Sequence, residues 1–201
     1  MTVEVANLPE ARRKWDWGEA SRVAYRLCAE LDPHCDRSIV AGSIRRGKPR
    51  VGDIEILYIP KCEWRPMQVD LFTEQRINLA DEAISVLERD GILERRRNAK
   101  GSEVFGPKNK LMRHVETGIP VDLFAATDEN WFNYLVCRTG PAESNIRIAS
   151  EARRRGWKWN PYGRGFSRGG PLAGPSGEFV VQSERDVFEF VGLPYLEPSE
   201  R

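Results

Sequence analysis

The segments Gly42-Ser-Ile-Arg-Arg-Gly47 and Val51-Gly-Asp-Ile-Glu-Ile56 decide how this chain is expected to fold. The short apolar run from Ser38 to Ala41 predicts a strand that stops at the first of these segments, and a second strand is expected from Asp53 to Ile59. Alternate residues of a strand point to the same side, so the two carboxylates of the second segment converge on one face. Such a pair can hold a divalent cation, which prefers oxygen ligands.

The turn at Gly42-Ser43 adds a hydroxyl and backbone N–H groups near that face, with nine residues between Ser43 and Asp53. Basic side chains lie between the two motifs at Arg45, Arg46, Lys48 and Arg50. This combination favours a site for a metal-bound triphosphate. Each motif alone is also compatible with a simpler structure: Asp53-x-Glu55 with the polar face of an edge strand, and Gly-Ser with an ordinary turn.

The order of these motifs resembles a pattern of the nucleotidyltransferase superfamily: an apolar residue with Gly-Ser, then nine residues, then Asp-apolar-Glu-apolar. The two quoted segments are similar to the family X DNA polymerase branch of that superfamily. Gly118-Ile-Pro-Val-Asp-Leu-Phe124 supplies Asp122 at 67 positions after Glu55, where that family places its third carboxylate. The same Val-Asp-Leu-Phe occurs earlier, with Asp70 only 15 positions after Glu55 and no hairpin before it. We therefore expect Asp70 to lie in a loop or at a helix entry.

Two further segments carry the resemblance. Val180–Arg201 is similar over its whole length to the closing segment of the family, and this is the most specific signal in the chain. Arg138-Thr139-Gly140, with Asn145 five residues after Gly140, resembles the family's thumb-side turn and the Asn that touches the incoming base. The resemblance covers roughly Trp15 to Arg201.

The resemblance implies two-metal phosphoryl transfer. Asp53 and Glu55 would bind the Mg²⁺ that carries the triphosphate, and all three acids would hold a second Mg²⁺, with Mn²⁺ as a possible substitute. Asp122 would lie closest to the attacking 3′-hydroxyl and could take its proton. Glu55 stands where the polymerase branch usually has Asp, which moves the carboxylate by about one bond length.

The resemblance also implies a set of residues around the incoming nucleotide. Ser43 and Arg46 would grip the β- and γ-phosphates, and Gly52 would let the backbone approach them. Thr139 and Gly140 would line the sugar, and Asn145 would reach the minor-groove edge of the base. The full set of expected substrate-binding residues is Gly42, Ser43, Arg46, Gly52, Thr139, Gly140 and Asn145.

Two departures from the family pattern change the expected activity. The aromatic pair that precedes Thr-Gly in the family is replaced by Cys137-Arg138. Since that pair helps to exclude the ribose 2′-hydroxyl, we expect weak discrimination against ribonucleotides. No N-terminal lyase domain or helix-hairpin-helix element is recognisable, so the expected form is a palm plus a thumb.

Hydrophobic spacing predicts an α+β fold with a mixed sheet flanked by helices. Amphipathic helices are expected from Trp17 to Leu31 and from Asn78 to Asp90, and Lys61 to Met67 reads as a loop. A change of character near residue 127 divides the chain into a palm with an N-terminal helix, residues 1–127, and a small α/β thumb, residues 128–201.

Composition narrows the class of protein. The 201 residues carry a net charge of +1, the four cysteines form no C-x-x-C pair, and no apolar run approaches the ~20 residues of a membrane span. A disulfide scaffold, a structural zinc site and a membrane protein are disfavoured. A monomer is expected in the cytoplasm, of a bacterium or of a phage-infected cell.

Charge is distributed unevenly along the chain. Eight basic residues face two acidic ones between Arg138 and Arg168, interleaved with Trp157, Trp159, Tyr162 and Phe166. A second basic region spans Arg95 to Arg113. Both are typical of nucleic-acid contact, and both are also compatible with solvated surfaces.

The predicted function is therefore a minimal DNA polymerase that adds dNTPs to the 3′-hydroxyl of gapped or primer-template DNA. Two alternatives remain open at this point. One is a template-independent nucleotidyltransferase acting on nucleic-acid ends or another acceptor, and the other is a catalytically silent nucleotide-binding module.

Overall fold

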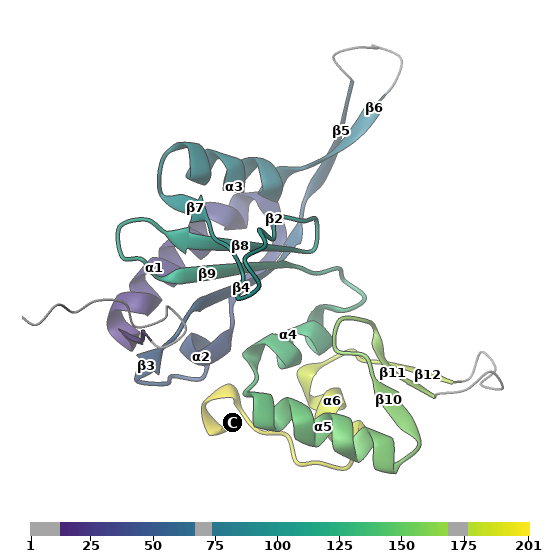
Figure 1. Ribbon diagram of the computed structural model, residues 1–201. Helices are drawn as coiled ribbons and strands as arrows, with labels where there is room; N and C mark the ends of the chain where they lie inside the picture. The colour runs from purple at the N-terminus through teal and green to yellow at the C-terminus, as the bar shows by residue number, and fades with distance from the viewer. Residues whose placement is uncertain (1–12, 67–73, 169–176) are drawn as a thin grey trace, which may run out of the picture.

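The computed structural model describes residues 13–66, 74–168 and 177–201. They form two lobes, with a five-stranded sheet in the first and a three-stranded sheet in the second (Figure 1). Separate clusters of buried hydrophobic side chains fill the two lobes. Asp70, the acid of the earlier Val-Asp-Leu-Phe, lies outside the described residues.

The sheet of the first lobe has the order β2-β4-β9-β8-β7. Its strands are β2 (Cys35–Val40), β4 (Ile54–Pro60), β9 (Pro120–Ala125), β8 (Asn109–His114) and β7 (Leu93–Arg95). The central strands β4 and β9 run parallel, whereas the outer neighbours pair antiparallel. This mixed sheet with flanking helices confirms the predicted α+β class. The mostly apolar sequence of β4 fits its place, because both of its faces are covered.

One face of this sheet is covered by α1 (Trp17–Leu31) and α3 (Leu79–Arg89), with the short η2 (Asp32–His34) after α1. Asp16 and Asn78 cap the two helices by accepting hydrogen bonds from backbone N–H groups of the first turn. The stripe of α1 that meets the sheet is Ala20, Ala24, Leu27 and Leu31. In the described ranges, no helix is long and apolar enough to cross a membrane.

The opposite face of β4 and β9 is covered by α4 (Trp131–Thr139). Successive side chains along each strand alternate between the α1–α3 side and the α4 side, as the two core clusters show. The buried residues on the α4 side are Leu57, Ile59, Phe124, Ala126, Trp131, Tyr134 and Leu135. Beside this face lie α2 (Gly42–Arg45) and the short pair β1 (Trp15–Asp16) and β3 (Arg50–Val51).

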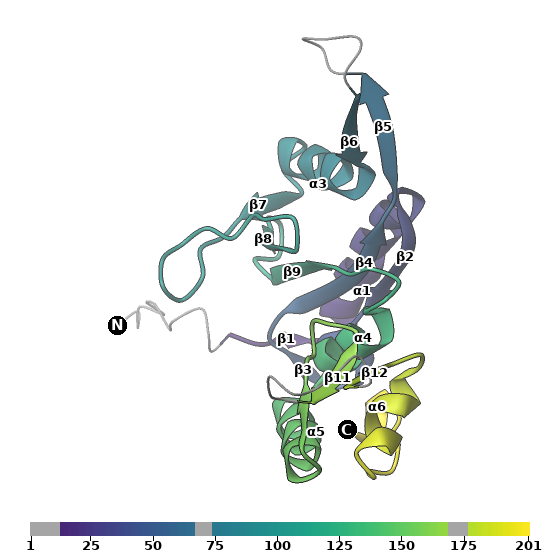
Figure 2. The same cartoon turned by 90° about the vertical axis from the view of Figure 1, so that its right-hand side faces the viewer.

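A two-stranded hairpin follows β4, where the sequence predicted a loop. It consists of β5 (Cys62–Pro66) and β6 (Glu74–Asn78), and it projects well beyond the first lobe (Figure 2). Glu63 and Arg65 alternate with apolar residues in β5, but β6 is polar except for Ile77, which lies opposite Glu63. The two strands therefore share no apolar face by which sequence reasoning could pair them.

The second lobe follows α4. Its elements are α5 (Ala142–Arg154), β10 (Trp157–Trp159), β11 (Gly165–Arg168), β12 (Glu178–Val180), α6 (Glu184–Phe190) and η3 (Pro198–Glu200). The buried indole of Trp159 donates a hydrogen bond of 2.7 Å to Asn133, which ties β10 to α4. A capping box between Ser183 and Asp186 starts α6.

Candidate active site

Three carboxylates meet where β4 and β9 run side by side. Glu55 on β4 lies directly opposite Asp122 on β9 in the parallel register, and Asp53 immediately precedes β4. The spacing of Asp53 and Glu55 and the strand order of the sheet therefore bring residues 67 positions apart to one face. Asp53 and Glu55 from the segment Val51–Ile56 and Asp122 from the segment Gly118–Phe124 are therefore brought together.

Burial and mutual repulsion set the electrostatics of these acids. Burial, followed by the charge of Asp53, raises the pKa of the Glu55 carboxyl to about 8. Burial and the charge of Asp122 raise the pKa of Asp53, and burial raises that of Asp122. Three partly buried carboxylates in one another's field favour a bound cation or a bound proton.

Two arginines meet these acids. Arg96 donates a hydrogen bond to Asp122, and both side chains are mostly buried. The guanidinium of Arg138 lies 4.0 Å from the carboxylate of Glu55 and 3.6 Å from the centre of the Phe124 ring. The Nε atoms of both arginines are buried without a hydrogen-bond partner, so neither guanidinium is fully engaged here.

The fit of the three acids to a divalent cation can be judged from their chemistry and arrangement. Within the described ranges, no three Asp, Glu, His or Cys side chains enclose a point where a metal ion would sit. The carboxylates of Glu55 and Asp122 are directed instead to Arg138 and Arg96. The carboxylate oxygens of Asp53, Glu55 and Asp122 are nonetheless donors of the type that Mg²⁺ prefers.

Gly42 is required next to Glu55. Its φ is +63°, and a Cβ at this position would lie 2.2 Å from Oε2 of Glu55. The turn therefore admits only glycine without moving the carboxylate. The following Ser43 has a buried hydroxyl with no hydrogen-bond partner in the described structure, which leaves it free to bind a ligand.

The Thr-Gly turn of the second lobe meets the Gly-Ser turn of the first. Arg46 donates a hydrogen bond from Nη1 to the carbonyl of Thr139, and burial lowers the pKa of Arg46. A Cβ on Gly140, whose φ is +63°, would lie 3.2 Å from the same Nη1 atom. Arg46, Thr139 and Gly140 are thus brought together as a group.

The other two predicted residues behave differently from each other. Asn145 donates a 2.9 Å hydrogen bond to the carbonyl of Cys137, and its own Oδ1 is buried without a partner. Gly52 is exposed, and nothing lies within 4 Å of a Cβ built on it. No described residue therefore packs so closely against position 52 that a side chain there would clash with it.

A buried ion-pair network joins the lobes beside the site. Arg45 contacts Glu184 through two hydrogen bonds of 2.6 and 3.0 Å, and donates a third, of 2.6 Å, to the hydroxyl of Thr139. Glu184 also accepts from Arg201 at 3.2 Å, and Lys48 donates to the backbone oxygen of Arg201 at 3.0 Å. Arg45 and Lys48, expected near a triphosphate, are thus engaged between the lobes.

Sequence reasoning missed four residues at or beside the site. Arg96 was one of seven basic residues in the region from Arg95 to Arg113, and only its position beside Asp122 of β9 distinguishes it from the others. Arg138 had been noted as a departure from the family pattern, but its contact with Glu55 depends on how the lobes meet. Glu184 and Arg201 carry no local signal, because their partners lie over 100 residues away or across a loop.

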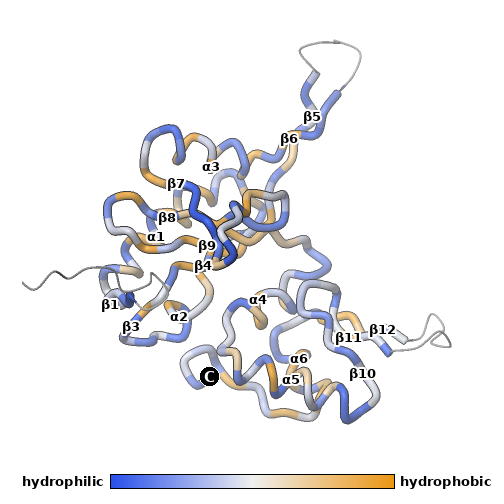
Figure 3. Tube along the Cα trace, viewed as in Figure 1, coloured by the Kyte–Doolittle hydropathy of each residue, from blue (hydrophilic) through white to orange (hydrophobic). Residues whose placement is uncertain are grey.

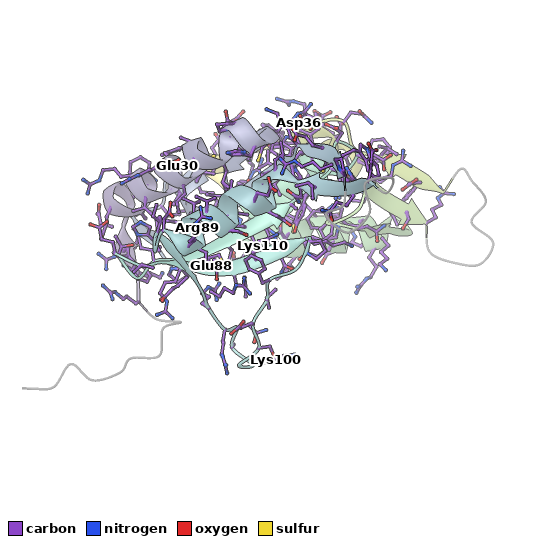
Figure 4. All side chains as sticks on the ribbon, turned by 90° about the horizontal axis from the view of Figure 1, so that it is seen from above. Glu30, Asp36, Glu88, Arg89, Lys100 and Lys110 are labelled. Atoms are coloured by element: carbon purple, nitrogen blue, oxygen red, sulfur yellow. The ribbon has the colours of Figure 1, made fainter. Side chains whose placement is uncertain are left out.

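Only part of the two basic regions lies on the surface, because Lys110, Arg96 and Arg138 are mostly buried and face acidic side chains. The hydrophilic connection between β7 and β8 is drawn in blue in Figure 3, and Figure 4 shows Lys100 at its outer end, away from the sheet. On the second lobe, Arg154 pairs with Glu151 at 2.7 Å, and Arg155 rests against Gly192. Arg153 is exposed and has no partner among the described residues.

Comparisons with known proteins agree with the overall fold. Residues 134–201 match the family model of the DNA polymerase beta thumb. The fold is similar to Leishmania infantum polymerase beta in a ternary P/T complex, with a TM-score of 0.69 and 19% identity, over 96% of this chain and 78% of that chain. A ternary gap complex of the same enzyme gives 0.71 and 18%, over 96% and 72%. No curated protein matches the sequence.

Proposed function

We propose that the chain is a minimal DNA polymerase of the family X type. It is a polymerase beta-like protein whose residues 134–201 match the polymerase beta thumb. It would add dNTPs to a DNA 3′-hydroxyl during gap filling or short-patch repair. The observation that carries this proposal is the group formed by Asp53, Glu55 and Asp122 on neighbouring parallel strands, next to a turn from each lobe.

The reaction is an in-line displacement at phosphorus. The primer 3′-oxygen forms a bond to the α-phosphorus, the bond from that phosphorus to the bridging oxygen breaks, and pyrophosphate leaves. We assign the acceptance of the hydroxyl proton to Asp122, because the family resemblance implies that this acid lies closest to the 3′-hydroxyl. Bound Mg²⁺, held by Asp53, Glu55 and Asp122, would neutralise charge on the phosphates and acidify the 3′-hydroxyl.

The triphosphate would lie at the meeting of the two turns. The unpartnered hydroxyl of Ser43 can donate to a phosphate oxygen, and the guanidinium of Arg46 supplies positive charge. Gly42 keeps the backbone close to Glu55, so the phosphates and the acids share one small region. Thr139 and Gly140 would then line the sugar.

The base of the incoming nucleotide would be met by Asn145. The amide Nδ2 is held by the carbonyl of Cys137, so the buried and unpartnered Oδ1 has a defined direction. An amide oxygen of this kind accepts a hydrogen bond from a base edge. We propose this role for Asn145 rather than for the exposed Ile146 that follows it.

Primer extension tests the proposed function. The substrates are a gapped duplex, a primer on an open template and an unpaired single strand, each with Mg²⁺ or Mn²⁺ and all four dNTPs. Asp122→Ala should abolish extension, whereas the exposed Asp90→Ala should retain it. Extension that is unaffected by Asp122→Ala would reject the assigned carboxylate, and no extension by the wild type on any DNA would reject the polymerase assignment.

A second candidate is a template-independent nucleotidyltransferase. It is favoured by Arg138, which occupies the place of a family aromatic residue and whose charge lies at Glu55. A cation there could accommodate acceptors other than a paired primer. Equal extension of the single strand and the gapped duplex would support this candidate over the templated polymerase.

A further inference from the structure

The β5–β6 hairpin presents two different faces. Trp64 lies opposite Arg76, and Cys62 lies opposite Asn78, in the antiparallel register. Directly opposite residues share a face, so these four side chains lie on one side of the hairpin. Arg65 lies on the other side, which is turned to α3 because Arg65 pairs with Glu82 there at 2.7 Å.

Among the described residues, Arg76 and the exposed Glu74 on the first face form no ion pair, whereas the charged residues of the other face are paired. Arg65 is paired with both Glu63 and Glu82. Arg76 is exposed and has no hydrogen bond or ion pair within the described ranges. The indole of Trp64 beside it is 65% exposed, more than any other tryptophan in the described chain. An unburied indole next to an unpaired guanidinium contributes little to the fold and is available to a ligand.

Cys62, Arg76 and Asn78 of this face also line a cavity of about 960 Å³. Arg76 of the hairpin, Lys108 before β8 and Tyr162 of the second lobe are among the residues that line it. At its inner end the cavity reaches Arg138, which lies 4.0 Å from Glu55. Arg138 therefore belongs both to the cavity and to the candidate site, although the three acids themselves do not line the cavity.

The side chains along this surface suit a single strand of nucleic acid. Trp64 and the 59% exposed Tyr162 offer ring faces on which unpaired bases can stack. Arg76 and Lys108 offer cations to phosphates, while Asp36 and Asp128 also line the cavity and would repel them. The basic residues that line the cavity are Arg76 on the hairpin, Lys108 before β8 and Arg138 beside Glu55.

We propose that the Trp64–Arg76 face of the β5–β6 hairpin binds the single-stranded part of the DNA substrate, next to the strand held at the three acids. The choice of DNA rests on the proposed function. A duplex would offer phosphates to Arg76 but no free base to the indole, so the pairing of the two side chains favours an unpaired strand. The hairpin would thereby add a DNA contact outside the thumb.

The test is equilibrium DNA binding by fluorescence anisotropy in EDTA, so that catalysis plays no part. The labelled DNAs are a blunt duplex and the same duplex with a short single-stranded overhang on its 5′ or its 3′ end. Trp64→Ala and Arg76→Gln are compared with Arg65→Gln, a matched change on the opposite face, and Tyr25→Ala, an exposed aromatic residue on α1. Circular dichroism verifies that each variant is folded.

Trp64→Ala should weaken binding of one overhang DNA by about five-fold or more, the effect of losing one stacked base. Arg76→Gln should weaken binding of the same overhang DNA. Both of these variants should bind the blunt duplex with wild-type affinity. The two control variants should bind every DNA with wild-type affinity. Unchanged affinity for both overhangs, or an equal loss on the blunt duplex, would overturn the proposal. If the wild type fails to extend primers but the two variants still show the selective loss of overhang binding, the polymerase assignment is rejected and the proposed DNA-binding face is retained.

Discussion

Glu55 and Asp122 lie directly opposite each other on the parallel strands β4 and β9, and each faces an arginine, Arg138 and Arg96 respectively. The two acids come from motifs far apart in the chain, and the arginines come from neither motif. Parallel pairing therefore concentrates negative charge, and side chains from other segments balance it. Five consequences of this arrangement and of the surrounding packing can be measured.

The first concerns stability and pH. The pKa of Glu55 is raised to about 8 from its ordinary 4.5, mainly by burial and then by Asp53. The folded chain keeps a proton that the unfolded chain releases, so this contribution is fully present below pH 4.5 and is lost as pH rises through about 8. In EDTA, the midpoint of thermal unfolding should fall over this range. Glu55→Gln should flatten the fall, and an identical profile in the variant would contradict the account.

The second concerns Arg96 as a positioning residue for Asp122. Arg96 lowers the pKa of Asp122 against the effect of burial, so Arg96→Gln should raise that pKa. The acidic limb of the kcat/KM profile should move to higher pH, and the rate near neutral pH should fall about ten-fold or more. Arg96→Lys should partly restore the profile. Arg95→Gln, which alters the neighbouring surface pair with Glu88, is the control; an equal shift there would argue against a specific role.

The third concerns the sugar of the incoming nucleotide. In the family that the sequence resembles, an aromatic pair stands where this chain has Cys137 and Arg138, and Arg138 lies against Phe124. The ratio of kcat/KM for a dNTP to that for the matching rNTP should be small. Steady-state insertion opposite one templating base measures it, and strong rejection of the ribonucleotide would show that another group excludes the 2′-hydroxyl.

The fourth concerns Gly42. Gly42→Ala would place a Cβ 2.2 Å from Glu55 in a backbone with φ of +63°. We expect a loss of about 1–3 kcal/mol in unfolding free energy and a displaced carboxylate, hence little extension. Gly91→Ala is the matched control, because Gly91 has a φ of +70° but open space around it. It should cost only the backbone strain, by urea denaturation, and retain activity.

The fifth concerns the junction of the lobes. Glu184 is 12% exposed and accepts hydrogen bonds from Arg45 and Arg201, whose own side chains are 18% and 0% exposed. Glu184→Gln leaves two buried cations without a counter-charge and should lower the unfolding free energy by about 3–5 kcal/mol. Glu189→Gln, which removes a surface pair with Arg185, should change it by less than about 1 kcal/mol. Similar losses in the two variants would contradict a buried network.

Much of the fold and of the acid group was predictable from sequence. The apolar spacing of α1 and its end at Asp32-Pro33 are local, and so is the alternation that puts Asp53 and Glu55 on one side. The third acid, Asp122, could be predicted because the family that the sequence resembles places its third carboxylate at this distance from the second. Local pattern and motif spacing were enough for these features.

The remaining features depend on contacts that no local pattern encodes. The β5–β6 hairpin has no buried residue, and the apolar alternation of β5 has no counterpart in β6 that would predict the pairing. Choosing Arg96 among its basic neighbours requires knowing which residue reaches Asp122. The bond between Arg46 and Thr139 spans 93 positions and exists only because the lobes meet at these turns.

The most direct test of the central claim is single-turnover insertion into a gapped duplex, with each of the four templating bases in turn. The account predicts that wild-type protein inserts the complementary nucleotide with Mg²⁺, and that Asp53→Asn, Glu55→Gln and Asp122→Asn each abolish insertion while still binding the DNA. Insertion that ignores the templating base would contradict a templated polymerase, and insertion that survives loss of these carboxylates would contradict the site.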